Sequence, residues 1–330
     1  MKNQHQSRLE LFVSNTQRMK KSFIWQNTLL KRLSALFYSA ENREVDCDAI
    51  RDSYELIKKS TGLFSAFRGN SAMSLAALLS LSKNREALLS DTLDVYETMK
   101  KAGFRSSDFL VVAAYQIAAN TDAAHHLNAV ERAKAFYDGM KKEHRFLTGR
   151  DDYIFAAMLG LSDIDIDVGL DRLEQLYAVF KPEIQSGNGV QALTQVLVLA
   201  GETTGAVSRL LKLRDALCEQ GIRLDKTYAV SSLGVLSLLP TDIDELVGDI
   251  SESYEFLRKQ KGFGPFSVTK QELMIFSAAL VAFGNVDDIK NGILTAAVST
   301  SITNIVIAQQ TAIAAAAASS AAAASSAASS

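Results

Sequence analysis

The chain has 330 residues, of which 48% are hydrophobic and 22% are charged. This mixture excludes a disordered chain, a collagen and a disulfide scaffold, and the length allows one large domain or two domains of about 150 residues. The 35 basic and 37 acidic residues leave a net charge of -2, so no overall field recruits nucleic acid or anionic lipid. Only 3 prolines are present, which favours long helices.

The N-terminal segment and the cysteines indicate a cytoplasmic protein. The first residues are charged and no apolar run follows them, so we expect no secretory signal. Cys47 and Cys218 lie far apart and have no metal-ligand spacing. We therefore expect both thiols to be reduced and to pack as small apolar side chains.

A short phrase centred on a tyrosine recurs along the chain, and around Tyr96 it reads DVYETMKKAG. The first four copies follow one another at nearly equal intervals of about 40 residues, and the last copy follows after roughly twice that interval. In the copy expected inside the longer gap, Arg214 takes the place of the tyrosine. The tyrosines of the five other copies are Tyr54, Tyr96, Tyr137, Tyr177 and Tyr254. Similarity at a fixed period of this size predicts stacked helical repeats.

Each copy contains two segments, which we name by their residues. The tyrosine segment, such as 91–101, places Leu93, Tyr96 and Met99 on one face of a predicted helix. The small-residue segment is more apolar, and its length and its alanine and leucine content favour a buried helix over a strand. The six small-residue segments are 71–81, 109–119, 153–161, 190–199, 228–239 and 274–283.

These features predict an all-α fold, namely an α-α solenoid of about six helical hairpins with a period of about 40 residues. One hairpin cannot bury its apolar stripe, whereas stacked hairpins bury a continuous core. We expect the repeats across roughly residues 25–285, with segment 8–21 covering the N-terminal end. The predicted domains are a helical-repeat solenoid over residues 1–288 and an uncharged tail rich in alanine and serine over residues 289–330.

The phrase VYETMKKAGFRSSDFLVVAAY at residues 95–115 resembles a pentatricopeptide-type repeat, and that resemblance implies RNA binding with one repeat per base. The period found here is longer than the unit of that family, and the net charge is slightly acidic. We therefore interpret the likeness as a shared helical-hairpin pattern and do not expect a nucleic-acid partner.

Four longer phrases resemble a bacterial family known as domain of unknown function 4003. The phrases are TGLFSAFRGN (61–70), HRFLTGRDDYIFAAML (144–159), GIRLDKTYAVSSLGVLSLL (221–239) and QKGFGPFSVTKQELMIFSAALV (260–281). The resemblance covers about residues 8–285. It implies a bacterial cytosolic setting, and it implies no activity, cofactor or catalytic residue.

The junctions, where a tyrosine segment ends and the next small-residue segment begins, are predicted to line one edge of the stack, here called the junction edge. Helix N-termini at this edge offer free N–H groups to an anion, and arginine can bind an anion bidentately. The candidate ligand-binding residues are Arg68, Asn70, Arg150, Asp151 and Asp152. A structural alternative assigns helix caps to the polar side chains Asn70, Asp152, Asp225 and Thr269.

Lysines also recur at the ends of the tyrosine segments, as in Lys58-Lys59 and Lys100-Lys101. They could form a basic ledge for an acidic partner, or they could simply complement helix C-termini. The repeated tyrosines are expected to pack their rings between helices and to point their hydroxyls toward the junction edge, although a ladder for stacking ligands is an alternative.

No catalytic or metal motif stands out. Asp163, Asp165, Asp167 and Glu174 have the spacing of a calcium loop, but Val168 stands where such a loop needs glycine. Asp167 and Asp244 each precede a repeat tyrosine position by ten residues, which predicts helix N-caps. His125 and His126 have no partner at a ligand spacing, and phosphate-loop and nucleophile-elbow patterns are absent. We predict no metal and no cofactor. The missing motifs favour a protein that is not an enzyme, and the sequence leaves that question open.

The C-terminal part of the chain carries no charge after Lys290. Most of residues 293–317 are apolar, with several polar side chains among them, and an Ala/Ser tract follows. Three interpretations stay open: a helix that packs on the open end of the solenoid, a membrane segment, or a self-association helix.

The leading prediction for function is a non-enzymatic helical-repeat scaffold that binds a protein or peptide partner. One alternative is an anion- or nucleotide-binding protein, possibly with hydrolytic activity, that uses Arg68 and Arg150. The other is a membrane-associated accessory protein attached through residues 293–317. The sequence does not define the oligomeric state.

Overall fold

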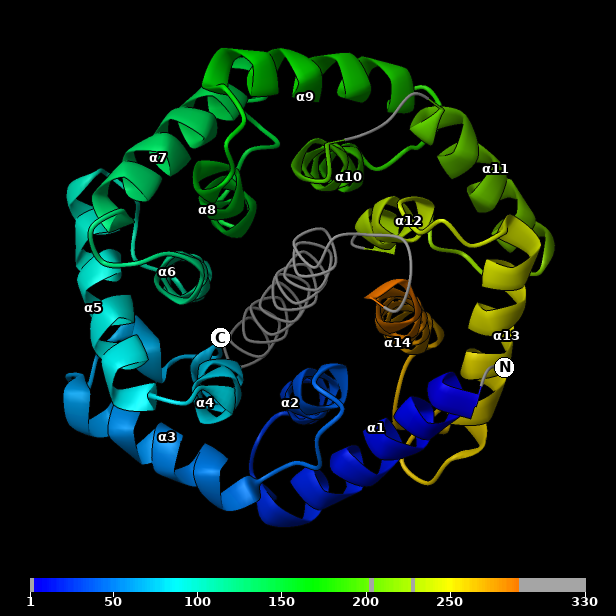
Figure 1. The fold of residues 1–330 in the computed structure, drawn as a ribbon, viewed down its shortest axis with the longest axis horizontal. Coiled ribbons are helices and arrows are strands. Elements are labelled where there is room, and N and C mark those ends of the chain that lie inside the picture. Colours follow the sequence, from blue (N-terminus) through cyan, green and yellow to red (C-terminus); the bar gives the residue numbers. More distant parts are fainter. Residues whose placement is uncertain (1–2, 202–204, 227–228, 291–330) are drawn as a thin grey trace, which may run out of the picture. The chain divides into compact units, whose positions relative to one another are not determined.

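A computed structural model describes residues 3–201, 205–226 and 229–290 of the chain. These residues form fourteen α-helices and one short 3-10 helix, and they contain no strand (Figure 1). The all-α prediction is therefore confirmed for the described residues, and the strand alternative for the small-residue segments is wrong. The predicted membrane or packing segment at 293–317 lies outside these residues.

The described residues fall into two compact units. Unit 1 contains residues 3–18, 38–44 and 171–290, and unit 2 contains residues 19–37 and 45–170. The division passes through three helices, α1 (Asn3–Ser22), α2 (Thr28–Ala40) and α9 (Ile166–Phe180).

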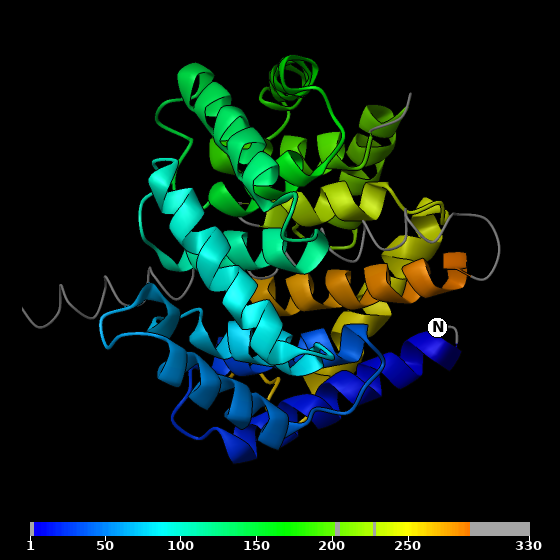
Figure 2. The same cartoon turned by 60° about the vertical axis from the view of Figure 1, so that its left-hand side comes forward.

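Unit 2 alternates tyrosine helices with small-residue helices. The tyrosine helices are α3 (Cys47–Ser60), α5 (Arg85–Lys101) and α7 (His126–Glu143); the small-residue helices are α4 (Ala72–Leu81), α6 (Asp108–Asn120) and α8 (Tyr153–Leu161). Each tyrosine helix packs against the small-residue helix that follows it. In addition, α5 contacts α7 and α6 contacts α8 (Figure 2). A 3-10 turn, η1 (Ala66–Arg68), lies between α3 and α4.

Unit 1 repeats the same alternation. It contains the tyrosine-position helices α11 (Ala206–Glu219) and α13 (Ile243–Lys259) and the small-residue helices α10 (Gly187–Leu199), α12 (Val230–Ser237) and α14 (Lys270–Lys290). Here α11 packs on α12 and α13, and α12 also contacts α10 and α14. All six predicted small-residue segments are thus helical.

The small-residue helices form the core because they are apolar on every side. In α4 the eight residues from Ala72 to Leu79 are all buried, and in α6 and α8 most residues are buried. A helix that is hydrophobic all round must be covered on all faces, whereas the tyrosine helices bury one face only. This difference explains the alternation within each unit.

Helix α1 packs against the last hairpin of the chain, within unit 1. The Phe12 ring lies 5.6 Å from the Phe263 ring and 5.5 Å from the Phe276 ring. At the start of α1, the His5 Nε2 atom lies 2.7 Å from the Ser253 hydroxyl on α13. The segment expected to cover the N-terminal end therefore contacts the C-terminal hairpin.

Two predicted N-caps are wrong by two residues. The caps are Asp165 before α9, which accepts a hydrogen bond from the Val168 N–H at 3.1 Å, and Asp242 before α13, which accepts from the Asp244 N–H at 2.8 Å. Asp167 and Asp244 instead lie in the first turns, where a negative charge complements the helix dipole.

Candidate functional site

In unit 2 the junctions before α4, α6 and α8 lie next to one another (Figure 2). The Asp108 carboxylate at the start of α6 accepts a hydrogen bond from the Ser71 N–H at the start of α4, at 2.8 Å. The Tyr153 hydroxyl at the start of α8 accepts from the Arg105 N–H in the preceding junction, at 3.2 Å. These contacts join three consecutive junctions into one edge of unit 2.

Arg68 is folded onto the C-terminal end of α3. Its Nη2 atom donates to the backbone carbonyls of Lys58 and Thr61, the latter at 2.5 Å, and its Nε donates to the Thr61 hydroxyl at 3.3 Å. Two backbone carbonyls at the end of α3 therefore gain a partner from Arg68, and its Nε binds a hydroxyl that itself donates to the Ile57 carbonyl. Asn70 is half-buried, and the N–H at the start of α4 is bound by Asp108. The predicted capping role of Asn70 is therefore wrong.

Arg150 is exposed, and its side chain makes no hydrogen bond or ion pair within the described structure. The two aspartates after it point elsewhere: Asp152 accepts from the Gly149 N–H at 2.8 Å, and Asp151 is half-buried. Burial raises the pKa of the Asp151 carboxyl above its ordinary value. In the described residues, no hydrogen bond or ion pair connects the Arg150 side chain with Arg68 or Asn70.

The repeat tyrosines pack against cations one turn later in the same helix. Lysine or arginine side chains lie over four tyrosine rings at 4.6–5.5 Å, in the pairs Tyr54–Lys58, Tyr96–Lys100, Tyr137–Lys141 and Tyr254–Arg258. Two of the rings are almost fully buried, and the Tyr96 hydroxyl is 2.7 Å from the Ser106 hydroxyl at the junction. The expected packing of these tyrosines is confirmed at Tyr96 and Tyr137.

An aromatic cluster holds the junction between α5 and α6 against α7 and α8. The Phe104 ring lies 5.6 Å from that of Tyr137 and 4.9 Å from that of Tyr153, and the two tyrosine rings are 5.0 Å apart. Burial and the neighbouring Tyr153 raise the pKa of the Tyr137 hydroxyl. This cluster is a packing element of the junction edge.

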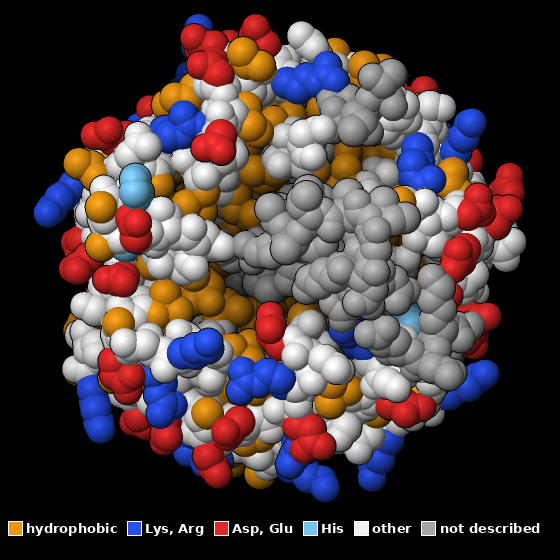
Figure 3. All heavy atoms as spheres, viewed as in Figure 1, with side chains coloured by type: hydrophobic (Ala, Val, Ile, Leu, Met, Phe, Trp, Pro, Cys, Tyr) orange, Lys and Arg blue, Asp and Glu red, His pale blue; other side chains and the backbone are white. Residues whose placement is uncertain are grey.

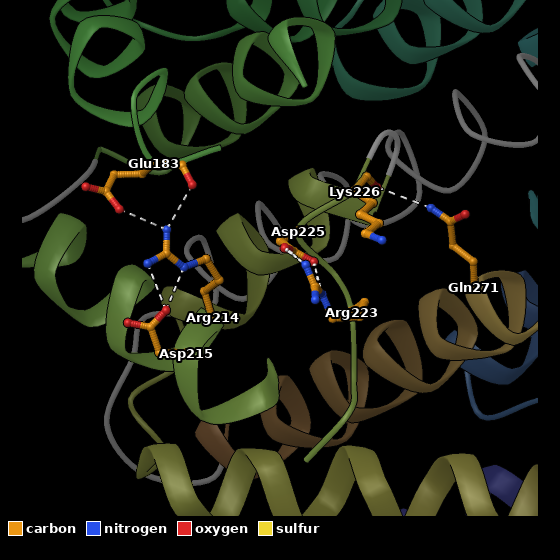
Figure 4. Close-up of polar contacts among 7 residues, drawn as sticks. All are labelled: Glu183, Arg214, Asp215, Arg223, Asp225, Lys226 and Gln271. Carbon is orange, nitrogen blue, oxygen red and sulfur yellow. Dashed lines mark hydrogen bonds and ion pairs between the residues drawn. The ribbon is translucent and has the colours of Figure 1, made fainter. Parts of the chain in front are cut away.

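In unit 1 the polar side chains near the junctions are paired with one another (Figure 4). Arg214 lies between Asp215, at 2.8 Å, and Glu183, at 3.2 Å, and its hydrogen bond with Asp215 raises the pKa of its guanidinium. Arg223 binds both oxygens of Asp225 at 2.6 and 2.8 Å, and this interaction lowers the pKa of Asp225.

The two junctions of unit 1 that precede α12 and α14 also contact each other. Gln271 donates to the Lys226 carbonyl at 3.2 Å (Figure 4), and Lys270 donates to the Gly221 carbonyl at 3.1 Å. Thr269 caps α14 as predicted, accepting from the Glu272 N–H at 3.1 Å. The Asp225 carboxylate, also predicted as a cap, binds Arg223, and residues 227 and 228, which it would cap, lie outside the described residues.

A polar pocket of about 350 Å³ lies at the other end of the small-residue helices of unit 2. Its lining includes His125, Asn128, Arg132 and Asp163. The His125 Nδ1 atom lies 2.5 Å from Asp122, which lowers the pKa of that carboxyl. On the face drawn in Figure 3, the histidine side chain at the left lies beside acidic side chains.

Arg132 supports this pocket by binding the end of α8. Its Nε donates to the Gly160 carbonyl at 3.1 Å, and its Nη2 donates to the carbonyls of Ser162 and Ile164 at 2.8 and 2.5 Å. These three N–H groups satisfy oxygens at a helix C-terminus. The Nη1 group makes no hydrogen bond within the described residues, and the guanidinium carbon lies 6.0 Å from the centre of the Phe136 ring.

Arg209 makes the same contacts at the end of α12 in unit 1. It donates to the carbonyls of Ser237 (3.0 Å), Leu239 (2.7 Å) and Thr241. In both cases the acceptors lie 28, 30 and 32 residues after the arginine. Each arginine precedes its repeat position, Tyr137 or Arg214, by five residues. That shared position is the sequence signal that could have identified them.

The sequence profile of a family described as proteins of unknown function, DUF4003, matches residues 15–312. The chain belongs to this family. It is similar to the uncharacterized protein YeaA of Bacillus subtilis (strain 168), with 24% identity over 281 residues that cover 83% of this chain and 82% of YeaA. No solved structure matches the chain.

The described part of this DUF4003 protein contains neither a metal cluster nor a membrane-spanning helix. Among the residues that the structure describes, no three His, Cys, Asp or Glu side chains are grouped so as to hold a metal ion. None of the described helices combines the length and the apolar character needed to cross a bilayer.

Proposed function

We propose that this DUF4003 protein is a helical-repeat scaffold, an α-α solenoid with a period of about 40 residues, that binds a protein or peptide partner and catalyses no reaction. The observation that carries the proposal is the repeated arginine contact. Arg209 follows Arg132 at twice the proposed period, and each arginine binds three carbonyls at the same offsets in the chain. Equivalent contacts two periods apart are what a repeat requires.

The cations over the tyrosine rings support the same proposal. They occur in α3, α5, α7 and α13, always with the cation four residues after the tyrosine. Stacked repeats of this kind produce extended surfaces, and such surfaces are used to bind other macromolecules.

The polar pocket of unit 2 is the proposed anchor for the partner. Its volume of about 350 Å³ is near the lower limit for small-ligand sites, so it accommodates one side chain or a chain end. Asn128 and the Nη1 group of Arg132 can donate hydrogen bonds to a backbone carbonyl of a bound peptide. Asp163 disfavours a second negative charge nearby.

Affinity capture from lysate of the source cells tests this proposal. A double variant, His125→Ala with Asn128→Ala, removes two pocket side chains and leaves the helix-end contacts of Arg132 intact. We expect the tagged wild type to recover a specific protein, the double variant to lose it, and the control Glu219→Ala, at an exposed site on α11, to retain it. Equal recovery by all three proteins would contradict the proposal.

A second candidate function is an anion or nucleotide site at the junction edge of unit 2 that uses Arg150, with Arg68 and Asn70 two junctions away. The exposed, unpaired guanidinium of Arg150 favours it. A ligand present at 100 times its Kd stabilises the fold by about 2.7 kcal/mol. A thermal-shift screen of phosphorylated compounds should therefore raise the Tm of the wild type and of Arg145→Gln, but not that of Arg150→Gln. No shift with any compound would remove this candidate.

A further inference from the structure

Three loops of unit 2 expose large apolar side chains almost completely. Each loop follows the first helix of a hairpin: α1 before α2, α3 before α4, and α7 before α8. The exposed fractions are 96% for Trp25, 103% for Phe64 and 98% for Phe146, and the neighbouring Ile24 and Leu63 are 70% and 78% exposed. Isolated exposed apolar residues are common, but full exposure of an aromatic ring at the same place in three hairpins is not random scatter.

The same loops carry basic residues in or beside them, and the loop between α7 and α8, residues 144–152, also contains Asp151 and Asp152. Residues 18–29 include three basic residues, residues 56–71 include three, and residues 144–150 include two arginines, with no Asp or Glu in any of these ranges. The intervening junction, residues 98–107, adds Lys100, Lys101 and Arg105, again without an acid. Basic residues therefore predominate near Trp25 and Phe64, whereas Arg145 and Arg150 share the loop of Phe146 with two aspartates.

Several of these cations are available to an external partner. Lys59, Lys101 and Lys142 are exposed and make no hydrogen bond or ion pair in the described structure, and the same holds for Arg145 and Arg150. The first lysine of each pair is occupied by a tyrosine ring, so the second lysine is the one that faces solvent.

The opposite ends of α6 and α8 are acidic, whereas Lys83 and Arg85 follow the opposite end of α4. Residues 161–168, after α8, contain Asp163, Asp165 and Asp167 and no basic residue, and Asp122 follows α6. The far ends of α6 and α8 therefore repel an anionic surface, whereas the exposed cations of the junction edge attract it. This asymmetry orients the unit as it approaches such a surface.

We propose that the junction edge of unit 2 docks on an anionic lipid bilayer, with Trp25, Phe64 and Phe146 inserted at the headgroup level. Aromatic rings are favoured at that depth, and lysine and arginine side chains beside them reach lipid phosphates. Separate protruding rings suit a deformable bilayer, whereas a protein partner needs a continuous, close-packed patch. The proposal goes beyond the scaffold function, and it does not involve residues 293–317.

Trp25 provides the direct measurement, because it is the only tryptophan of the chain. The full-length protein is mixed with vesicles of phosphatidylcholine alone or with vesicles in which phosphatidylglycerol replaces part of it. We expect co-sedimentation and a blue shift of Trp25 emission with the anionic vesicles only, and we expect both to weaken as ionic strength rises.

Variants distinguish the loops from other routes of attachment. Phe64→Ser and Phe146→Ser should each weaken vesicle binding about tenfold. The control Leu127→Ser changes a 59% exposed residue at the other end of α7 and should bind like the wild type. Because all these side chains are exposed, the variants should fold, and circular dichroism verifies this.

Three results would overturn the proposal. The first is a folded wild type that neither sediments with anionic vesicles nor changes its Trp25 emission. The second is binding that Phe64→Ser and Phe146→Ser leave unchanged, which would assign attachment to another part of the chain. The third is an emission shift caused only by a membrane-free lysate fraction, which would make the occupant a protein.

Discussion

At the scale of single residues, a glycine allows α8 to approach α7 closely. A Cβ atom at Gly160 would lie 2.5 Å from the Ala129 carbonyl oxygen and 2.6 Å from the Ala133 nitrogen, both of them backbone atoms. Gly248 in α13 differs, because nothing lies within 4 Å of a Cβ added there. Both glycines are helical, so their consequences for stability come from packing and propensity alone.

Gly160→Ala is expected to lower the free energy of unfolding by about 1–3 kcal/mol, because the added methyl group must push two helix backbones apart. Gly248→Ala is the matched control and should raise it by about 0.5–1 kcal/mol through helix propensity. Urea denaturation monitored by circular dichroism measures both. An unchanged or raised free energy of unfolding for Gly160→Ala would show that α7 and α8 are not in close contact at this position.

Asp151 should make stability depend on pH. Because burial raises its folded-state pKa above the unfolded value, the folded protein binds this proton more tightly, and stability falls as pH rises through that range. Asp151→Asn removes the buried charge, so we expect a higher Tm at pH 7 and a gain that disappears below the ordinary aspartate pKa of about 3.9. Asp94→Asn, at an exposed carboxyl on α5, should change the Tm little at either pH.

At the scale of helices, the arginines that bind helix ends are the contacts most clearly shared by the two units. Each uses the planar fork of a guanidinium to reach three carbonyls spaced two residues apart. A lysine ammonium is a single point charge and cannot reach the same set. These residues therefore hold a small-residue helix to the preceding tyrosine-position helix.

Arg132→Lys and Arg209→Lys should each lower the free energy of unfolding by about 1.5–3 kcal/mol, the range for hydrogen bonds that involve a charged group. Arg145→Lys, at an exposed arginine without a partner, should change it by less than about 0.5 kcal/mol. Denaturant titration of the three variants checks this expectation. If Arg132→Lys matched the control, the carbonyl contacts would not stabilise the fold.

At the scale of the whole molecule, unit 1 is built from residues close to both ends of the described chain. Phe12 is fully buried against Phe263 and Phe276, and His5 contacts Ser253. The covering helix of this unit therefore comes from the opposite end of the described sequence. Its folding must wait until the C-terminal hairpin is present, since such long-range contacts carry a large loop-closure cost.

Phe12→Ala is expected to destabilise unit 1 by about 3–5 kcal/mol, the usual cost of removing a buried phenylalanine side chain. Hydrogen exchange should show faster exchange of the amides of α13 and α14, which α1 covers. Ser14→Ala, at an exposed position of the same helix, should leave their protection unchanged. Unaltered exchange in Phe12→Ala would show that α1 does not stabilise the hairpin.

The helices themselves could be predicted because the signals that specify them are local. The segment at 153–161 coincides with α8, and the alternation of tyrosine and small-residue segments recurs as alternating helices in both units. Helical periodicity and the apolar character of a segment depend only on neighbouring residues. The positions of the helix caps are predicted less accurately. Asp165 and Asp167 have the same side chain, and only the backbone geometry decides which of them caps α9.

The sequence predicts where the candidate site lies in the chain, but it does not predict which of its side chains are free to bind a ligand. Arg68 and Arg150 occupy equivalent-looking junctions, yet Arg68 binds the carbonyls of α3 and Arg150 remains free. The pocket around Arg132 was missed, because its lining comes from three separate segments. The exposure of Phe64, in contrast with the burial of Phe67 three residues later, was also beyond the reach of the sequence.

The amino-acid sequence by itself determined the helical class, the positions of the helices and the alternation of two helix types, because burial patterns repeat along the chain. Only the tertiary structure decided which cations, carboxylates and aromatic rings stay accessible. An arginine can bind the carbonyl of any residue, and any apolar side chain can be buried. Which carbonyl is bound and which ring stays exposed therefore depends on how segments far apart in the chain come together in space.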